Sequence, residues 1–252
     1  MKTVNQTMLL MLFLIVATFS SNAQNQLYWV HEDHVKPAMQ AEYEKTSKEL
    51  VDACKKYKIQ NSDWNAARMD NGVYLSIAPI ANMAELDTNT FAVLAEKMGK
   101  DNLAAIWERF NKCYDKHGSY VVELMSDLSY MPNGLTVNTE GQNYRKYHYF
   151  YVTPANSKAV ADKLKEIKAL FASKGSKEYY RIYHSGFGTI GEYYMAAVSA
   201  KDVQDYEKTS DENEKLLGDA WKTKFNELFL LSARYDVKTG YMRPDLGYTT
   251  KK

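Results

Sequence analysis

The chain has 252 residues, in which 32 Lys and Arg balance 31 Asp and Glu to a formal net charge of +1. This balance lacks the basic excess of nucleic-acid-binding surfaces, so nucleic acid is not an expected partner. The mean hydropathy of −0.50 fits a water-soluble chain. The 20 Tyr stand out, because aromatic rings with a polar tip suit half-wet strands.

Residues 1–23 have the pattern of a secretory signal peptide. Lys2 precedes an apolar run over 8–19, and a small-residue exit ends at Ala23. The run is shorter than the roughly 20 apolar residues that span a bilayer. We therefore expect cleavage near Ala23 and export to the bacterial periplasm or the medium, with no membrane association afterwards.

The first half, 24–135, alternates strand and helix patterns in the order βαββαβ. Pro37 stands where a helix begins, and Asp70-Asn71-Gly72 signals a hairpin whose second strand we expect Pro79 to stop. The expected elements are a strand over 27–34, a helix over 39–57, strands over 62–69 and 73–78, a helical insertion over 84–100, a helix over 103–114 and a strand over 120–128.

The second half, 144–240, repeats this order after a polar linker over 136–143, and 241–252 is expected to form a tail. The expected elements are a strand over 147–152, a helix over 156–172, strands over 179–184 and 192–198, a helix over 212–228 and a strand over 229–237. Pro154 and His148 follow Pro37 and His31 by 117 residues (154 − 37 and 148 − 31), which predicts an internal duplication.

Each βαββαβ half corresponds to the split βαβ, or ferredoxin-like, arrangement, in which two helices cover one face of a sheet. The other face needs a cover, and a second copy packed sheet to sheet supplies it. The sequence therefore predicts an α+β fold in which two tandem ferredoxin-like repeats form a single-chain α+β barrel.

Two stretches carry a family resemblance: the helix entry from Val35-Lys36-Pro37 to Tyr43, and the hairpin exit Gly72-Val73-Tyr74 with Pro79, each with a counterpart in the second half. With them the chain resembles the dimeric α+β barrel superfamily, and looks like a tandem relative of the NIPSNAP and antibiotic biosynthesis monooxygenase-like families. The resemblance covers nearly all of the chain after 23. It implies a barrel fold shared by oxygenases, haem-degrading enzymes and members without known activity.

Two cysteines in an exported chain invite a disulfide. Cys54 and Cys113 each lie late on the apolar stripe of a helix, and the two helices of this fold run antiparallel. The thiols would then lie at opposite ends, beyond the Cα separation of about 7 Å that a bridge allows. We expect two buried, free thiols.

The histidines do not form a metal-binding pattern. His31 and His34 are three apart on a strand and point to opposite faces. His117 precedes Gly118 and is expected at a helix C-terminus, where an imidazolium complements the dipole. We predict no metal site, and we expect His31 and His148 on the same kind of face, either both toward the barrel or both toward the helices.

Alternation with period two separates two faces on the first strand of each half. One face holds Trp29, His31, Asp33 and Val35 with His148, Phe150 and Val152, and the other holds Val30, Glu32 and His34 with Tyr147, Tyr149 and Tyr151. The second face suits a polar cavity between the sheets, although the pattern leaves the reverse assignment open. The candidate ligand-binding residues, a set able to hold an anionic or aromatic small molecule, are His31, His34, Trp64, Arg68, Tyr74, His148, Tyr149, Tyr151, Arg181, Tyr183 and His184.

No motif of a serine hydrolase, a zincin or a thioredoxin occurs, and Gly186-Phe187-Gly188 joins two strands, so catalytic residues stay unassigned. The first hypothesis is an exported protein that binds a small molecule between the two sheets. The resemblance implies an alternative, a cofactor-independent monooxygenase or a haem-degrading enzyme, with haem as the possible cofactor. A third hypothesis is a structural or partner-binding scaffold. We expect a monomer or a weak homodimer.

Overall fold

A computed structural model describes residues 25–250 of the chain. The signal peptide expected over 1–23 lies outside the described residues. The strands are β1 (Gln26–Val35), β2 (Asn65–Met69), β3 (Val73–Ile80), β4 (Tyr114–Tyr130), β5 (Tyr144–Val152), β6 (Tyr180–Ser185), β7 (Glu192–Ala200) and β8 (Arg234–Met242). The helices are α2 (Gln40–Tyr57), α3 (Ala92–Met98), α4 (Lys100–Cys113), α5 (Ser157–Lys174), α6 (Val203–Leu217) and α7 (Asp219–Leu231), with short 3₁₀ helices η2 (Pro37–Met39), η3 (Met83–Asp87) and η4 (Pro244–Leu246).

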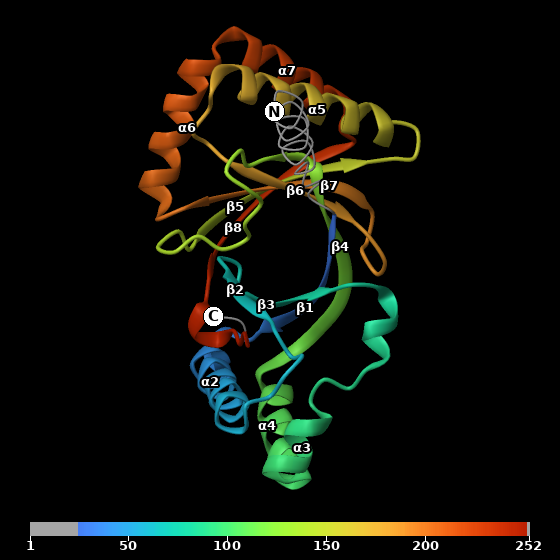
Figure 1. Ribbon diagram of the computed structural model, residues 1–252, viewed down its shortest axis with the longest axis vertical. Helices are drawn as coiled ribbons and strands as arrows, with labels where there is room; N and C mark the ends of the chain where they lie inside the picture. The colour runs from blue at the N-terminus through green and yellow to red at the C-terminus, as the bar shows by residue number, and fades with distance from the viewer. Residues whose placement is uncertain (1–24, 251–252) are drawn as a thin grey trace, which may run out of the picture.

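The described strands close into one antiparallel barrel in the order β1-β3-β2-β8-β5-β7-β6-β4. Each half contributes a four-stranded sheet, and the sheets join edge to edge where β2 pairs with β8 and β4 pairs with β6. Figure 1 shows α2, α3 and α4 at one end of the molecule and α5, α6 and α7 at the other, with the strands between them. The predicted single-chain α+β barrel of two ferredoxin-like halves is confirmed.

The main helix of each half packs one apolar face on its sheet. α2 and α5 are both 18 residues long, and their first and last residues are each 117 apart (157 − 40 and 174 − 57). α2 buries Tyr43, Leu50 and Cys54, as the apolar stripe in the sequence predicts. Cys54 and Cys113 are buried and free, which confirms the expected pair of unbridged thiols.

Several expected boundaries were wrong, and each has a local cause. Pro79 does not stop β3, which runs to Ile80; β2 pairs with β3 only as far as Ile77, so the missing N–H of Pro79 faces an unpaired edge. The helix expected over 212–228 is two helices, α6 and α7, which break at Gly218 with φ of +64°.

β4 begins at Tyr114, well before the strand expected over 120–128. His117 therefore lies on a strand and not at a helix end, which corrects the prediction for this residue. No helix within residues 25–250 is long and apolar enough to cross a membrane.

Candidate functional site

Side chains alternate along β1 between the inside of the barrel and the helix layer. Tyr28 and Val30 line the interior, whereas Trp29, His31 and Asp33 face a cavity on the helix side. In the second half Tyr147 and Tyr149 also face inward. The sequence analysis left two assignments of the faces open, and the structure has Val30, Tyr147 and Tyr149 inside the barrel. His31 and His148 both lie on the helix side of their sheets.

The space between the two sheets is largely filled by side chains. It leaves a cavity of about 80 Å³, among whose lining residues are the predicted Tyr149, Arg181 and Tyr183. Sites for drug-sized ligands occupy about 300 to 1,000 Å³. The interior therefore has room for a few small atoms and not for a ligand of haem or antibiotic size.

A larger cavity of about 770 Å³ lies in the first half, between the outer face of β1 and β3 and the layer made by α2, α4 and the segment from 85 to 91. Aromatic rings form much of its wall, namely Trp29, Tyr43, Trp64, Phe91, Trp107, Phe110 and Tyr114. Phe91 packs edge-on against Trp64 and Trp107, with ring centroids 6.1 and 5.2 Å apart. The volume and the aromatic wall suit an organic small molecule.

Three polar side chains are hydrogen-bonded in series on the wall formed by β1 and α2. His31 Nε2 lies 3.2 Å from Asp33 Oδ1, and Tyr43 donates to Asp33 Oδ2 at 2.7 Å. Asp33 is 6% exposed. Burial, together with the negative charge of Asp33, holds the pKa of Tyr43 far above its usual range, so Tyr43 remains a donor. The other ring nitrogen of His31, Nδ1, lies 2.8 Å from Ser119 Oγ.

The pairing of β1 with β4 brings a second histidine to this place. His31 lies opposite Ser119, and Asp33 lies opposite His117. One ring nitrogen of each histidine and one oxygen of Asp33 lie within 4.8 Å of one another. This donor set is of the kind that binds transition-metal ions, although His31 and Asp33 already hydrogen-bond to each other. The sequence analysis considered only His34 as a partner for His31, and His34 instead bonds Glu32 Oε1 at 3.0 Å.

The charge of the larger cavity is negative. Among the described residues its lining includes Asp33, Asp63 and Glu85 but neither Lys nor Arg. The cavity therefore favours an uncharged or cationic aromatic ligand, with cation–π contacts available to a cation. The sequence analysis allowed an anionic or an aromatic ligand, and Arg68 and Arg181, the two arginines that would hold an anion, do not line this cavity.

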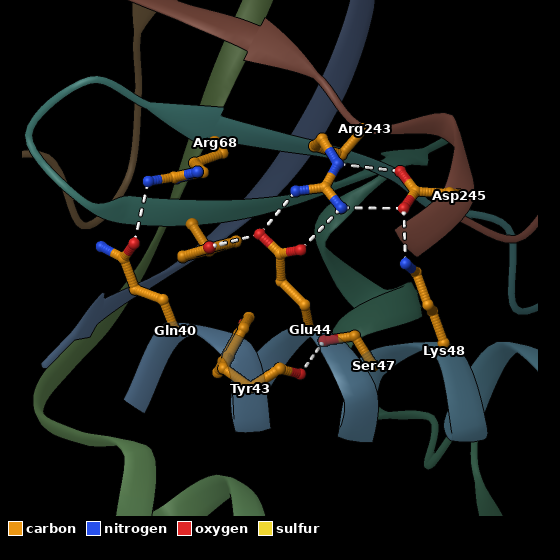
Figure 2. A network of polar contacts seen from close by, with 9 residues as sticks. Gln40, Tyr43, Glu44, Ser47, Lys48, Arg68, Arg243 and Asp245 are labelled. Atoms are coloured by element: carbon orange, nitrogen blue, oxygen red, sulfur yellow. Dashed lines mark hydrogen bonds and ion pairs between the residues drawn. The ribbon is translucent and has the colours of Figure 1, made fainter. Parts of the chain in front are cut away.

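The chain after β8 returns to the first half and closes one side of the cavity. Leu246 lines the cavity and accepts a hydrogen bond from Trp64 Nε1 at 3.0 Å. Arg243 holds this segment to α2 through two bonds to Glu44, at 2.6 and 2.8 Å, and it also bonds Asp245 (Figure 2). The hydrogen bonds from Arg243 lower the pKa of Asp245 to about 2 and lower the pKa of Glu44.

Two predicted ligand-binding residues belong to this network. Tyr74 donates to Glu44 Oε1 at 2.7 Å, and Arg68 donates to Gln40 Oε1 at 2.8 Å (Figure 2 labels Arg68 and Gln40). Both attach α2 to the sheet and neither lines the cavity. Of the eleven predicted residues, His31 and Trp64 lie in the larger cavity.

The equivalent place in the second half is apolar. His148 corresponds to His31, and the pairing of β5 with β8 puts Phe150 opposite Tyr235 and His148 opposite Val237. Phe150, Tyr235 and Val237 thus stand where the first half has Asp33, His117 and Ser119. His148 Nδ1 is 2.6 Å from the Tyr235 hydroxyl and Nε2 is 3.3 Å from that of Tyr206. Burial lowers the pKa of His148 to about 4.

The last two predicted residues, His184 and Tyr151, line neither cavity, and their side chains contact other residues. His184 Nε2 lies 3.2 Å from Glu192 Oε1, and its ring stacks on Tyr194. Tyr151 stacks on Tyr149 and lies under the guanidinium of Arg234, 3.8 Å from the ring centroid.

His31 and His148 do not offer a haem iron a free axial nitrogen, because both ring nitrogens of each are hydrogen-bonded. A haem iron is held by an axial side chain. His148 has both ring nitrogens hydrogen-bonded to tyrosine hydroxyls, and the cavity beside His31 is lined by carboxylates, without Lys or Arg among the described residues. The sequence analysis missed Asp33, Tyr43, His117 and Phe91 as cavity or near-cavity residues. The alternation that puts His31 and Asp33 on one strand face was the available signal, whereas nothing local in the sequence placed His117 beside them.

Comparison with solved structures supports the fold. The chain is similar to an anthrone oxidase-like protein (TM-score 0.57, 14% identity, covering 86% of this chain and 91% of that one) and to a proposed monooxygenase from Lactobacillus acidophilus NCFM (TM-score 0.56, 12% identity, covering 90% and 97%). It is also similar to a mutant chlorite dismutase from Candidatus Nitrospira defluvii (TM-score 0.50, 9% identity, covering 87% and 92%). No protein-family model and no curated protein match the sequence. At these identities the likeness concerns the α+β barrel fold.

Proposed function

We propose that the protein is an oxygenase-type enzyme that binds an uncharged or cationic aromatic compound in the larger cavity of its first half. The observation that carries this proposal is the aromatic-walled cavity of about 770 Å³ with the bonded series His31, Asp33 and Tyr43 on one wall. Two proteins of similar fold are described as an anthrone oxidase-like protein and a proposed monooxygenase, which supports oxygen chemistry as the reaction class.

His31 is the proton acceptor in this proposal. When its Nε2–H donates to Asp33, its Nδ1 carries the basic lone pair, and Asp33 stabilises the imidazolium that forms. Nδ1 takes the proton of a phenolic hydroxyl or an acidic C–H group, either directly or through the Ser119 hydroxyl 2.8 Å away. The carbanion left at an acidic CH₂ group adds to dioxygen through a new C–O bond and gives the peroxide R₂CH–OO⁻, which takes a proton back from the imidazolium. Loss of water then breaks the O–O bond and the remaining C–H bond: R₂CH₂ + O₂ gives R₂C=O + H₂O, with all four electrons supplied by the substrate carbon.

Two further features of the protein are part of the proposal. The expected signal peptide at 1–23 supports export, so the enzyme would act in the bacterial periplasm or outside the cell. The equal lengths of α2 and α5 and their common offset of 117 support an origin by internal duplication, of the kind that a tandem relative of NIPSNAP-like proteins would have.

Ligand binding is tested by tryptophan fluorescence, because Trp29, Trp64 and Trp107 line the cavity. The mature chain is titrated with a matched set of phenolic compounds carrying no charge, an amine or a carboxylate. We expect saturable quenching by the first two and at least about tenfold weaker binding of the third, because the cavity carboxylates repel it. Phe91→Ala should weaken binding about tenfold or more through lost ring contact. Phe229→Ala is the matched control, because Phe229 is an exposed residue of the second half, and it should leave the binding affinity unchanged.

Catalysis is tested by oxygen uptake in the presence of the compounds that bind. His31→Gln should lower the rate of oxygen uptake at least about 100-fold, because it removes the general base. The affinity for the aromatic compound should change little. Tighter binding of the carboxylate compound, or equal uptake by His31→Gln, would contradict the proposal.

A further inference from the structure

Two buried arginines lie side by side inside the barrel. Arg145 on β5 and Arg181 on β6 are each 3% exposed, and both line the interior cavity of about 80 Å³. Their charges are close enough that Arg181, together with burial as the larger cause, lowers the pKa of Arg145 to about 10. Two like charges in a low-dielectric interior are costly unless an opposite charge or a full set of hydrogen bonds compensates them.

No carboxylate lines this interior cavity in the part of the chain that the structure describes, and Glu32, on the same face of β1 as Val30, bonds His34. Arg145 donates to the carbonyls of Val137, Gln142 and Tyr144, and Arg181 donates to the carbonyl of Thr136 and to Ser199 Oγ. These neutral acceptors attach the segment 136–143 over the barrel, but they leave both guanidinium charges without a counter-ion.

One donor is also left without a hydrogen bond. Arg181 Nε is buried and has no partner among the described residues. Buried polar groups are almost always bonded, so an unbonded guanidinium N–H beside a cavity points to a missing acceptor.

The cavity has the composition of an anion site with an apolar end. The hydroxyl-bearing Tyr147 and Tyr183 line it beside the two arginines, and burial keeps the pKa of both phenols high, so they remain donors. The rest of its wall is mostly apolar or aromatic, with Val30, Met69 and Met195 among the aliphatic and thioether side chains, and Asn65 and Asn138 as further polar ones. Its volume of about 80 Å³ admits a ligand of up to about six heavy atoms, the size of a four-carbon carboxylate.

We propose that the barrel interior binds a small monovalent anion, with a short-chain carboxylate as its best ligand, at Arg145 and Arg181. The carboxylate oxygens accept from the guanidinium groups, including Arg181 Nε, and the short alkyl chain lies against the apolar wall. This site is separate from the larger cavity, because the interior and the helix layer face opposite sides of the sheet. It is independent of the proposed oxygenase function.

The test is calorimetric titration of the mature chain, dialysed into a buffer whose anion is too large for the cavity, with sodium butyrate, sodium chloride and 1-butanol at equal concentration. We expect one butyrate bound per chain and a saturable rise in thermal midpoint, because a ligand of the native state stabilises it by mass action. Chloride should bind more weakly, and 1-butanol, which has the same chain without the charge, should not bind.

Arg181→Gln should weaken butyrate binding at least about tenfold, since it removes a charge-assisted pair of hydrogen bonds. Tyr183→Phe, which keeps the ring and removes only the hydroxyl, should weaken binding by a smaller factor. Arg234→Gln is the matched control, because this arginine is exposed and lies over Tyr151 outside the cavity lining.

Absence of a butyrate heat with the wild-type chain would overturn the proposal, whether or not the variants fold. Equal effects of butyrate and 1-butanol, or equal losses in Arg181→Gln and Arg234→Gln, would also overturn it. Binding of chloride alone would show an inorganic anion site and contradict the carboxylate assignment. Because aromatic binding is followed separately by fluorescence, failure here leaves the proposed enzyme function unaffected.

Discussion

His31 and His148 occupy equivalent places on β1 and β5, and their neighbours give them different chemistry. His31 has a buried carboxylate on one nitrogen and faces a cavity, and these two features make it the base in the proposed reaction. His148 has tyrosine hydroxyls on both nitrogens and lies among apolar rings, so its charged form is disfavoured. The residue type alone therefore did not distinguish a candidate base from a packing residue.

The low pKa of His148 predicts a contribution to acid instability. Burial keeps this side chain neutral in the fold down to a pKa of about 4, whereas the unfolded chain takes up the proton at its ordinary pKa of 6.5. The contribution of neutral His148 to the free energy of unfolding is therefore fully present above pH 6.5. It decreases between pH 6.5 and about 4, by at most about 1.4 kcal/mol per pH unit. Denaturant unfolding across this window should show a smaller decline in His148→Gln than in the wild type.

Tyr235→Phe separates burial from hydrogen bonding in this effect. It removes one hydroxyl partner and leaves His148 buried, so most of the decline should remain. If His148→Gln and the wild type lose stability in parallel from about pH 7 to about pH 4, the assignment of this decline to His148 is wrong.

At the scale of elements, local patterns predicted helices better than strand ends. The apolar stripe of α2 was visible because Tyr43, Leu50 and Cys54 recur on one helical face. The start of β4 was not visible in the sequence, because the stretch over 114–119 (YDKHGS) is polar and mostly exposed. Its pairing with β1 makes it a strand. Such non-local hydrogen bonds leave no periodic signal, and for this reason the sequence analysis misplaced His117.

The segment after β8 was expected to be part of a tail, yet it packs on the first half. Tyr248 is 6% exposed and donates a hydrogen bond to the carbonyl of Ile59 at 2.7 Å, and Arg243 donates to the Glu44 carboxylate. The sequence has no local signal for this packing, because the partners Ile59 and Glu44 precede Tyr248 and Arg243 by 189 and 199 residues.

Breaking this attachment should loosen the cavity wall. Arg243→Ala removes two charge-assisted bonds to Glu44 from a half-buried site, and we expect a loss of about 1 to 3 kcal/mol in the free energy of unfolding. Lys208→Ala, which removes an exposed pair with Glu212 at 4.0 Å, is the control and should cost no more than about 0.5 kcal/mol. Urea unfolding measures both, and equal small losses would contradict the role given to Arg243.

At the scale of the whole molecule, the barrel makes each half depend on the other. The interior face of the first sheet, with Tyr28, Val30 and Leu124 buried, is covered by the second sheet and by Leu135 and Val137 of the connection between the halves. The edge strands β2 and β4 find their outer partners in β8 and β6. The βαββαβ order was readable from the sequence and fixed this architecture, whereas the position of the larger cavity depended on side-chain packing that the order does not contain.

Cutting the chain within the linker tests this dependence. Residues 24–135 alone would expose two strand edges and an apolar sheet face, so we expect this fragment to self-associate or aggregate. Co-expressed with residues 136–252, it should form a soluble one-to-one complex. Light scattering after size-exclusion chromatography measures the mass of the fragment and of the complex. A folded, monomeric 24–135 fragment would contradict the expectation.

The difference between the two halves has a consequence for how the protein can change over time. In a barrel made from two identical subunits, every substitution appears twice, so a new acid or base beside one sheet is unavoidably copied beside the other. In this chain each position is encoded once. The first half can carry Asp33 and His117 while the second keeps Phe150 and Tyr235 at the matching places. One half is thereby free to acquire new chemistry while its counterpart preserves the packing that holds the barrel closed.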